Sequence, residues 1–269
     1  MYTSAELTVD SIRKHYDQFA WAYRLFWGEH VHHGLFANRN DGPKRAQGAL
    51  LRLCADQAGL KCPSQVIDVG CGHGGTARFL AREYACSVLG LTISAKQHAI
   101  AQKLSSAADY QGSVRFELAN AETYSFPAES FDLVWNMESS EHFFDKPSYF
   151  RKVAAALKPG GRLMVAAWTG SMEHQLVREI ADVFLCPELL TAKQYSQCFM
   201  EAGMTLLSSL QLAGQVAPTW DICARRVGAA GPFIAVMPEQ YQSFVDGIQL
   251  MQRGYSSGQL SYSILVAQK

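Results

Sequence analysis

The sequence predicts an α/β fold in which helices cover both faces of a mostly parallel sheet. From Gln65 onward, short apolar runs typical of buried strands alternate with amphipathic helical stripes, and each strand–helix–strand step implies a right-handed crossover. The 269 residues are 48% hydrophobic and 18% charged, which supplies enough apolar side chains for a sizeable core. Both observations favour one large α/β domain.

The predicted strands are short apolar segments, which in chain order are QVIDVG (65–70), CSVLGL (86–91), SVRFEL (113–118), FDLVWNM (131–137) and GRLMVAAW (161–168). Between them, apolar residues at helical spacing predict helices over 77–84, 95–104 and 149–157. The last of these helices is expected to end at Lys158-Pro159-Gly160-Gly161, because proline cannot continue a helix and glycine permits a left-handed stop.

The flanking segments are predicted to be more helical. An apolar stripe from Ile12 to Trp27 predicts a first helix, and a second is expected to begin near Asp41–Pro43 and run to Gly59. Towards the C-terminus the patterns predict a helix over 191–202, a strand at 204–212, a helix over 238–251 and a last strand at 259–268. No repeat or linker interrupts the chain.

Bulk composition narrows the possible partners and location. Lys plus Arg and Asp plus Glu are both 24, so the formal net charge is zero, which disfavours a nucleic-acid partner. There is no apolar run of transmembrane length and no signal-peptide pattern. The seven cysteines form no C-x-x-C pair, which is typical of reduced thiols in the cytosol. We therefore expect a cytoplasmic protein without a membrane span, and a homodimer is compatible with the sequence.

A glycine-rich loop follows the first predicted strand. Gly70, Gly72 and Gly74 are spaced by two, and Asp68 lies two residues before the first of them. Glycines there let the backbone turn sharply and approach a ligand, at the sheet edge where open α/β folds bind nucleotides. Gly75 also fits the dinucleotide pattern G-x-G-x-x-G, so the loop alone leaves the cofactor open.

Three later features separate a nucleoside cofactor from a dinucleotide. The second strand ends in Leu91-Thr92, without the acidic residue that a nicotinamide ribose requires. Asn120-Ala121-Glu122 follows the third strand, where a side-chain oxygen can accept from an adenine amino group. The fourth strand ends in FDLVWNMESSEH (131–142), which places polar groups beside the other end of the cofactor.

The chain resembles the class I S-adenosylmethionine-dependent methyltransferases, and within them the γ-tocopherol methyltransferase-like branch. The motifs that carry this resemblance are WGEHVHHGLF (27–36), VIDVGCGHGG (66–75), GLTISAKQ (90–97), NMESSEHFFDK (136–146) and LKPGGRL (157–163). They cover residues 15–170 well and the C-terminal third loosely. The resemblance implies a seven-stranded, mostly parallel Rossmann-like sheet with an N-terminal helical lid and helical insertions after the fifth strand.

The resemblance also implies which residues bind S-adenosylmethionine. Asp68 would organise the glycine loop, and Tyr16 resembles the cofactor-contacting tyrosine of the lid helix, although its place in an apolar stripe equally fits ordinary core. The remaining implied cofactor residues are Gly70, Gly72 and Gly74 along the methionine and ribose, Thr92 and Gln97 near the ribose and adenine, Asn120, Ala121 and Glu122 at the adenine, and Asn136 and Met137 near the sulfonium.

Glu138, Glu141 and His142 form the candidate catalytic cluster. Spacings of three and four bring them together if a helical turn follows the fourth strand. We hypothesise that His142 is a base or an acceptor-positioning group and that Glu141 orients it, because a hydroxyl or protonated amine acceptor must lose a proton. The alternative is that His142 only packs against the cofactor or caps a turn.

His32, His33 and Trp220 are candidate substrate residues. The histidine pair lies in the segment that, by resemblance, folds over the cofactor, and it lacks the further ligands at suitable spacing that a metal would need. Trp220 in APTWD (217–221) corresponds to a similar segment of the tocopherol-like branch and is expected to face the substrate. We expect no metal.

The sequence thus predicts methyl transfer from S-adenosylmethionine to a carbon, oxygen or nitrogen atom of a small, largely apolar acceptor of natural-product, alkaloid or quinone-like character. The alternatives are a non-methylating enzyme such as a cyclase on the same scaffold, because fold does not determine function, and an idle binding protein. We expect a single domain over 1–269, divided into a lid and N-terminal extension (1–60), a cofactor-binding core (61–170) and an acceptor-pocket part with the last strands (171–269).

Overall fold

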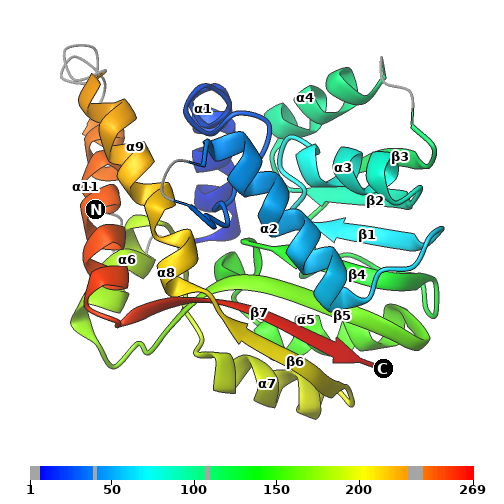
Figure 1. The fold of residues 1–269 in the computed structure, drawn as a ribbon. Coiled ribbons are helices and arrows are strands. Elements are labelled where there is room, and N and C mark those ends of the chain that lie inside the picture. Colours follow the sequence, from blue (N-terminus) through cyan, green and yellow to red (C-terminus); the bar gives the residue numbers. More distant parts are fainter. Residues whose placement is uncertain (1–6, 39–40, 107–109, 230–238) are drawn as a thin grey trace.

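A seven-stranded sheet forms the centre of the computed structural model, which describes residues 7–38, 41–106, 110–229 and 239–269. The strands lie in the order β3-β2-β1-β4-β5-β7-β6 (Figure 1). Their bounds are β1 Gln65–Val69, β2 Ser87–Thr92, β3 Ser113–Leu118, β4 Phe131–Met137, β5 Leu157–Gly170, β6 Thr205–Gln211 and β7 Leu260–Gln268. All pairs from β3 to β5 are parallel, and β7 is antiparallel to both β5 and β6. The predicted mostly parallel, seven-stranded sheet is confirmed.

Helices cover both faces of this sheet, because the strand side chains that point to either face are largely apolar. On one face lie α2 (Pro43–Ala58) and α3 (Gly75–Glu83), where Leu50 and Leu80 share a core with Trp135 of β4. On the other face, α5 (Lys146–Ala156) and α7 (Ala192–Glu201) contribute Phe150 and Phe199 to a second core around Val134. Helix α4 (Ala95–Ser105) packs beside β2 and β3 at the sheet edge.

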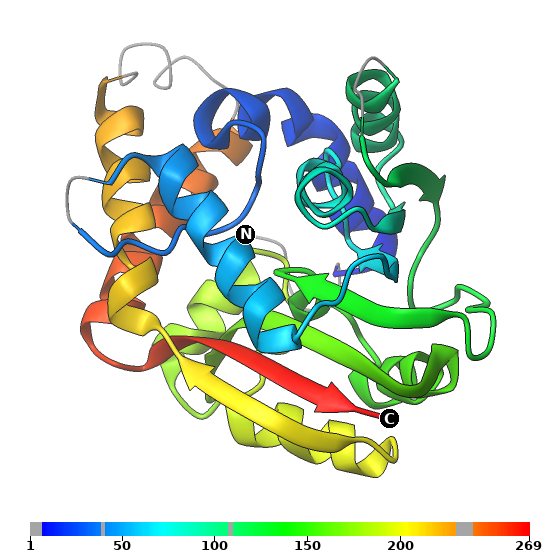
Figure 2. The same cartoon turned by 45° about the vertical axis from the view of Figure 1, so that its right-hand side comes forward.

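The added helices gather at one end of the sheet. Helix α1 (Val9–Trp27) lies over the carboxyl ends of the central strands, and α6 (Gln175–Val183), α9 (Pro218–Ala229) and α11 (Glu239–Ser256) stand together beside it (Figures 1 and 2). The short α8 (Ala213–Val216) leads into α9. The predicted lid and the insertions after the fifth strand are therefore present. No helix in the described ranges is long and apolar enough to cross a membrane.

Most predicted boundaries lie close to the observed ones, and the clearest differences are the start of β5 at Leu157 and the end of α11 at Ser256. Helix α2 begins at Pro43, as predicted, with Gly42 as N-cap, and ends at a left-handed Gly59. Helix α5 ends at Ala156, before the predicted Lys158–Gly161 stop, because Leu157 is already extended and pairs with Phe131. Helices α6, α8 and α9 were not predicted. Residue 238 of the helix predicted over 238–251 lies outside the described residues.

Candidate active site

The glycine loop after β1 adopts the backbone conformation for which glycine is suited. Gly70, Gly72 and Gly74 all have positive φ angles, of 79°, 54° and 75°. A Cβ on Gly70 would lie 2.3 Å from the Cβ of Ser139, so only glycine lets the loop approach the end of β4 this closely. Gly70 and Gly72 line a large cavity at the carboxyl ends of the strands. Gly74 is absent from the lining of this cavity and packs against Phe116, so its contact with the cofactor stays a prediction.

Asp68 lies at the end of β1, beside a smaller cavity that continues past Gly70 and Gly72. Its side chain is buried, and burial raises the pKa of the carboxyl to about 7, against the lowering effect of the Ala77 backbone N–H. The Oδ2 atom has no hydrogen-bond partner, and neither does His30 Nδ1 on the opposite wall of the same cavity. Two buried polar atoms without partners indicate that this cavity accommodates a polar ligand group.

The far end of the main cavity is lined by Asn120, Ala121 and Glu122. The side chains of Asn120 and Glu122 already accept hydrogen bonds from the backbone. The Asn120 Oδ1 atom accepts a hydrogen bond from the Glu122 backbone N–H at 2.9 Å, and Glu122 Oε1 accepts from the N–H groups of Phe144 and Asp145. The Asn120 side-chain oxygen therefore has one of its two lone pairs used by the local turn, and acceptance from an adenine amino group by the other stays a prediction.

Two predicted cofactor residues meet at the end of β2. Thr92 Oγ1 donates to Gln97 Oε1 at 3.1 Å, and both line the main cavity. Ser94 between them caps α4, and it also donates to Asp17 of α1 at 2.6 Å. The lid helix is thus attached to the sheet at the adenine end of the predicted site.

Asn136 and Met137 occupy different environments although they are adjacent in β4. Met137 lines both cavities. Asn136 is fully buried below them, where its amide donates to Tyr149 and accepts from the Ser140 N–H. Its predicted position at the sulfonium is corrected, since alternate strand residues point to opposite faces of the sheet.

A third cavity adjoins the large one lined by Gly70 and Gly72, and its walls are largely aromatic. Its aromatic lining residues include Trp27, Trp168, Phe184 and Trp220. The rings meet edge to face, with Phe184 lying 5.2 Å from Trp168 and 5.5 Å from Trp220. Edge-to-face packing holds such rings rigidly and leaves an apolar surface towards the cavity. We call this the aromatic cavity and the larger one, lined by Gly70, Gly72 and Asn120–Glu122, the main cavity.

Four residues line both cavities, namely Tyr16, Val31, Glu138 and His142. Tyr16 comes from the lid helix, Val31 from the segment after it, and the other two from the end of β4 and the turn that follows. The predicted helical turn is the 3₁₀ turn η1 (Ser140–His142). The two cavities therefore meet where the lid covers the carboxyl end of β4.

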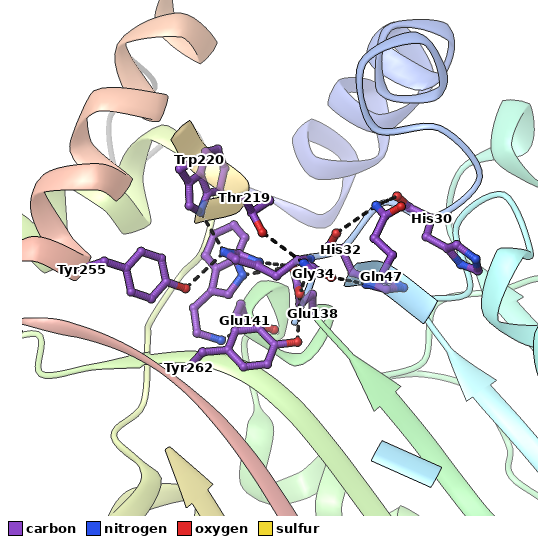
Figure 3. A network of polar contacts seen from close by, with 12 residues as sticks. His30, His32, Gly34, Gln47, Glu138, Glu141, Thr219, Trp220, Tyr255 and Tyr262 are labelled. Carbon is purple, nitrogen blue, oxygen red and sulfur yellow. Dashed lines mark hydrogen bonds and ion pairs between the residues drawn. The ribbon is translucent and has the colours of Figure 1, made fainter. Parts of the chain in front are cut away.

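Glu138 lies at this junction in a dense hydrogen-bond network (Figure 3). It accepts from the His33 backbone N–H, His33 Nδ1, Trp168 Nε1 and Tyr262 Oη, at 2.8 to 3.1 Å. Burial by itself raises the pKa of the carboxyl, but the His33 ring and backbone N–H lower it overall. The Glu138 backbone has a positive φ of 50°, a strained conformation that such a network can hold.

His33 is a neutral imidazole in this network. Trp220 Nε1, which can only donate, lies 2.7 Å from His33 Nε2, so that nitrogen carries a lone pair. Tyr255 Oη donates to the same nitrogen at 3.1 Å. Both ring nitrogens of His33 and the Trp220 N–H are used inside the wall of the aromatic cavity.

His142 has both ring nitrogens engaged. Nδ1 donates to the Leu185 carbonyl at 3.1 Å, so Nε2 is the unprotonated nitrogen and accepts from Tyr16 Oη at 2.7 Å. Burial lowers the pKa of His142 to about 4. The orienting contact predicted from Glu141 is made instead by the Leu185 carbonyl, because the turn of η1 directs Glu141 towards β5.

Glu141 presents an incompletely used carboxyl to the aromatic cavity. Oε1 accepts from the Trp168 backbone N–H at 2.9 Å, while the buried Oε2 has no partner. Burial raises the pKa of Glu141 to about 8. The two carboxyls at the end of β4 thus differ in charge at neutral pH, with Glu138 ionised and Glu141 protonated.

Several residues of the aromatic cavity were missed from the sequence. Trp27 and Trp168 form part of its walls, and Tyr255 and Tyr262 complete the hydrogen bonds behind it. Trp27 ends the predicted first helix and Trp168 ends the predicted fifth strand, so their place at element ends was a usable signal. Nothing local marks Tyr255 or Tyr262, which reach the site only through the packing of α11 and β7.

This fold, with a glycine loop at the end of β1 and two joined cavities under a helical lid, is that of a class I S-adenosylmethionine-dependent methyltransferase. Comparison with known proteins gives the family. Residues 3–245 match the model of the family described as mycolic acid cyclopropane synthetase, and the chain belongs to this family.

Among curated relatives, the chloroplastic tocopherol O-methyltransferase of Arabidopsis thaliana is 26% identical over 99% of this chain and 84% of its own length. The 27-O-demethylrifamycin SV methyltransferase of Amycolatopsis mediterranei (strain S699) is 31% identical over 81% and 82%. Among solved structures, mycolic acid cyclopropane synthase CmaA1 complexed with SAH has a TM-score of 0.87 at 22% identity, covering 97% and 98%. The [4+2]-cyclase SpnF has a TM-score of 0.83 at 24% identity, covering 97% and 96%.

The protein is therefore a small-molecule methyltransferase, and its cofactor is S-adenosylmethionine. The cofactor supplies an electrophilic methyl group carried on a sulfonium. The site fits this cofactor. The main cavity is lined by Gly70 and Gly72, and the smaller cavity beside Asp68 contains the unpartnered Asp68 Oδ2 atom, which suits the ammonium of an amino-acid group.

Proposed function

We propose that the acceptor is a small, largely apolar molecule that binds in the aromatic cavity and is methylated at a hydroxyl oxygen. The observation that carries this proposal is the shared wall of Tyr16, Val31, Glu138 and His142, through which the main and aromatic cavities join. An acceptor in the aromatic cavity has its reacting atom beside a cofactor in the main cavity, and such positioning accounts for much of the catalysis of methyl transfer.

The walls support an apolar acceptor with at least one polar atom. Trp27, Trp168, Phe184 and Trp220 provide flat apolar surfaces that suit a ring or an unsaturated chain. The protonated Glu141 can donate a hydrogen bond from its unpartnered Oε2 to an acceptor oxygen. The names of two relatives, a tocopherol O-methyltransferase and a 27-O-demethylrifamycin SV methyltransferase, also favour an oxygen atom.

We assign His142 and Tyr16 the role of positioning the junction. Their hydrogen bond joins the lid helix to η1 at the border of the two cavities. Glu138 keeps a negative charge at the same border, where it favours positive charge on groups bound nearby. His33 and Trp220 form the wall that holds Glu138 in place.

The test is mass spectrometry of small-molecule extract from the host, incubated with the protein and methyl-deuterated S-adenosylmethionine. We expect a product that carries one labelled methyl group on oxygen and that is absent with the Gly72→Asp variant. A Cβ at Gly72 meets no atom within 4 Å, so the aspartate side chain enters the cofactor space. Because the φ angle of Gly72 is +54°, the variant is also compared with wild type by circular dichroism and thermal unfolding to show that it is folded. Label on carbon or nitrogen would overturn the hydroxyl assignment and retain methyl transfer.

A cyclase on the same scaffold is the second candidate, since SpnF shares the fold. In that case the purified protein would bind the cofactor by calorimetry, no extract component would take up label, and some component would change without a gain of mass.

Two further expectations remain proposals, a cytoplasmic location and a homodimer. Fractionation of the host and light scattering of the purified protein measure them.

A further inference from the structure

We propose that His32 is the general base of the reaction and that its Nε2 atom removes the proton of the acceptor hydroxyl. This inference rests on the proposed function, because it requires an acceptor in the aromatic cavity. It departs from the expectation that His142 is the base. Three features of the structure support it, and they concern the free lone pair of His32, the engagement of the other histidines and the charge of Glu138.

His32 presents an unprotonated, unpartnered nitrogen. Its Nδ1 lies 2.6 Å from the His33 carbonyl oxygen, which only accepts, so Nδ1 carries the proton. Nε2 therefore has a lone pair, and this buried atom has no hydrogen-bond partner. The residue is only 5% exposed and lines the aromatic cavity and also the cavity beside Asp68. A buried imidazole oriented by a carbonyl, with a free lone pair at a ligand cavity, has the geometry of a base.

The other histidines of the aromatic cavity are engaged at the corresponding nitrogen. His142 Nε2 accepts from Tyr16 Oη at 2.7 Å, and His33 Nε2 accepts from Trp220 and Tyr255. His15 Nε2 is hydrogen-bonded to Tyr23 Oη at 2.9 Å. A proton transferred to any of these atoms would first require a hydrogen bond to break. The His32 Nε2 atom has no hydrogen bond to lose.

The charge of Glu138 favours a proton on His32. Burial lowers the pKa of His32 overall, while Glu138 and the hydrogen bond to the His33 carbonyl raise it in opposition. The cavities that His32 lines also contain the following titratable groups: Glu29, His30, Asp68 and His73 on the glycine-loop side, His15, Tyr16 and Tyr23 of α1, Glu138, Glu141 and His142 around η1, and His33 and Arg226. Among them Glu138 is the buried carboxylate held ionised, so it stabilises the imidazolium that the reaction forms.

The proton and electron pairs balance in a single displacement. The hydroxyl proton of the acceptor passes to His32 Nε2, and the oxygen electron pair forms the new bond to the methyl carbon. The bond between methyl carbon and sulfur breaks with its pair remaining on sulfur, which becomes a neutral thioether. The positive charge lost from sulfur is then carried by the imidazolium of His32, close to Glu138. The products are the methyl ether and S-adenosylhomocysteine.

Kinetics with the acceptor found by label transfer tests this role directly. For His32→Gln we expect kcat to fall by about 100-fold or more, the usual contribution of a general base. The dissociation constant of S-adenosylhomocysteine should change less than about threefold, and the residual rate should rise with pH as the acceptor hydroxyl ionises by itself. Imidazole added to His32→Ala should restore part of the rate.

His174→Gln is the matched control. His174 is exposed at the N-cap of α6 and lines neither the main cavity, the cavity beside Asp68 nor the aromatic cavity. It should leave both kcat and the affinity for S-adenosylhomocysteine within a few-fold of wild type. If His32→Gln instead loses affinity for S-adenosylhomocysteine in proportion to its loss of kcat/KM, or turns over within a few-fold of wild type, His32 is not the base.

A second measurement needs no acceptor and separates failure of this inference from failure of the proposed function. Diethylpyrocarbonate acylates unprotonated imidazole nitrogens, and peptide mass spectrometry locates the modified residue. At neutral pH we expect His32 to react faster than His33 and His142, whose nitrogens are engaged. If His32 reacts only after unfolding, its lone pair is not available and the inference fails. If His32 reacts but no extract component takes up label, the proposed acceptor chemistry fails instead.

Discussion

The carboxylate of Glu138 accepts hydrogen bonds from both the backbone N–H and the imidazole Nδ1 of His33, at 2.8 and 3.0 Å. This pair joins the end of β4 to the segment after the lid helix, across 105 positions of the chain. With Trp168 and Tyr262 as further donors, every favourable acceptor position of the buried carboxylate is used. The junction of the two cavities is therefore a rigid, negatively charged point in an otherwise aromatic wall.

Glu138→Gln tests how much the hydrogen bonds of Glu138 contribute to the stability of the fold. The amide group of glutamine places N–H donors against the donors of His33 or Trp168, so at least one buried donor loses its acceptor. We expect a loss of about 2–5 kcal/mol in the free energy of unfolding, measured with urea. The exposed Glu129→Gln should stay within about 0.5 kcal/mol of wild type. Equal effects of the two substitutions would contradict the network.

Tyr16→Phe tests the contact between lid and junction. Removal of the hydroxyl leaves His142 Nε2 without its donor and detaches the lid helix from η1. A hydrogen bond of about 1 kcal/mol that holds the closed lid corresponds to an S-adenosylhomocysteine affinity roughly fivefold weaker, measured by calorimetry. Tyr23→Phe removes a hydroxyl from the same helix that bonds His15 and does not line the main cavity. If Tyr23→Phe weakens binding as much, the contact to His142 is not specific.

Asp68 should make cofactor binding depend on pH. Burial raises its pKa to about 7, so the carboxyl is neutral at pH 5.5 and ionised at pH 8. Only the ionised form attracts an ammonium, and the affinity for S-adenosylhomocysteine should therefore increase as pH rises, by at most about tenfold per unit below pH 7. In Asp68→Asn the same titration should be flatter and the affinity at pH 8 lower. Parallel pH profiles of the two proteins would show that another group is responsible.

Because of the raised pKa of Glu141, the free energy of unfolding should decrease as pH rises. This pKa is about 8 in the folded protein against an ordinary value of 4.5, so folding favours the protonated form. The penalty is absent below about pH 4.5, grows by at most about 1.4 kcal/mol per pH unit, and stops growing above pH 8. Glu141→Gln keeps an acceptor for the Trp168 N–H and removes this dependence.

Urea unfolding at pH 5, 6.5 and 8 measures that difference. We expect the variant to gain on wild type as pH rises across this window. Asp68, whose pKa is also raised, contributes a slope to both proteins and cancels in the comparison. A constant difference in stability at all three pH values would mean that Glu141 is already ionised in the folded protein near pH 5.

Local patterns in the sequence were sufficient for the sheet and for the cofactor loop. Strands β1, β2 and β4 are mostly apolar runs because they are buried on both faces, and this pattern can be recognised in the sequence without knowledge of the neighbouring strands. The spacing of Gly70, Gly72 and Gly74 reflects positive φ angles, which are a property of the loop itself. The lid helix and its break at Gly28 are similarly local.

The states and contacts of the site were decided only by the tertiary structure. Glu138 and Glu141 are three residues apart, yet one is ionised and the other protonated, because His33, Trp168 and Tyr262 happen to meet the first. Asn120 and Asn136 lie at the ends of strands as expected, but their side-chain oxygens accept hydrogen bonds from the backbone N–H groups of Glu122 and Ser140. Which histidine keeps a free lone pair is likewise invisible in the motif EHVHHG (29–34).

The sequence by itself determined the α/β sheet and the glycine loop, since each depends on periodicity and spacing within a short stretch of chain, and the family resemblance of its motifs indicated the cofactor. The tertiary structure alone decided the protonation, orientation and availability of the polar groups. Those properties depend on burial and on donors contributed by segments as distant as Tyr16 and His142, or His33 and Tyr255. Electrostatic interactions and hydrogen bonds act through space, so residues separated by more than a hundred positions set the chemistry of the site.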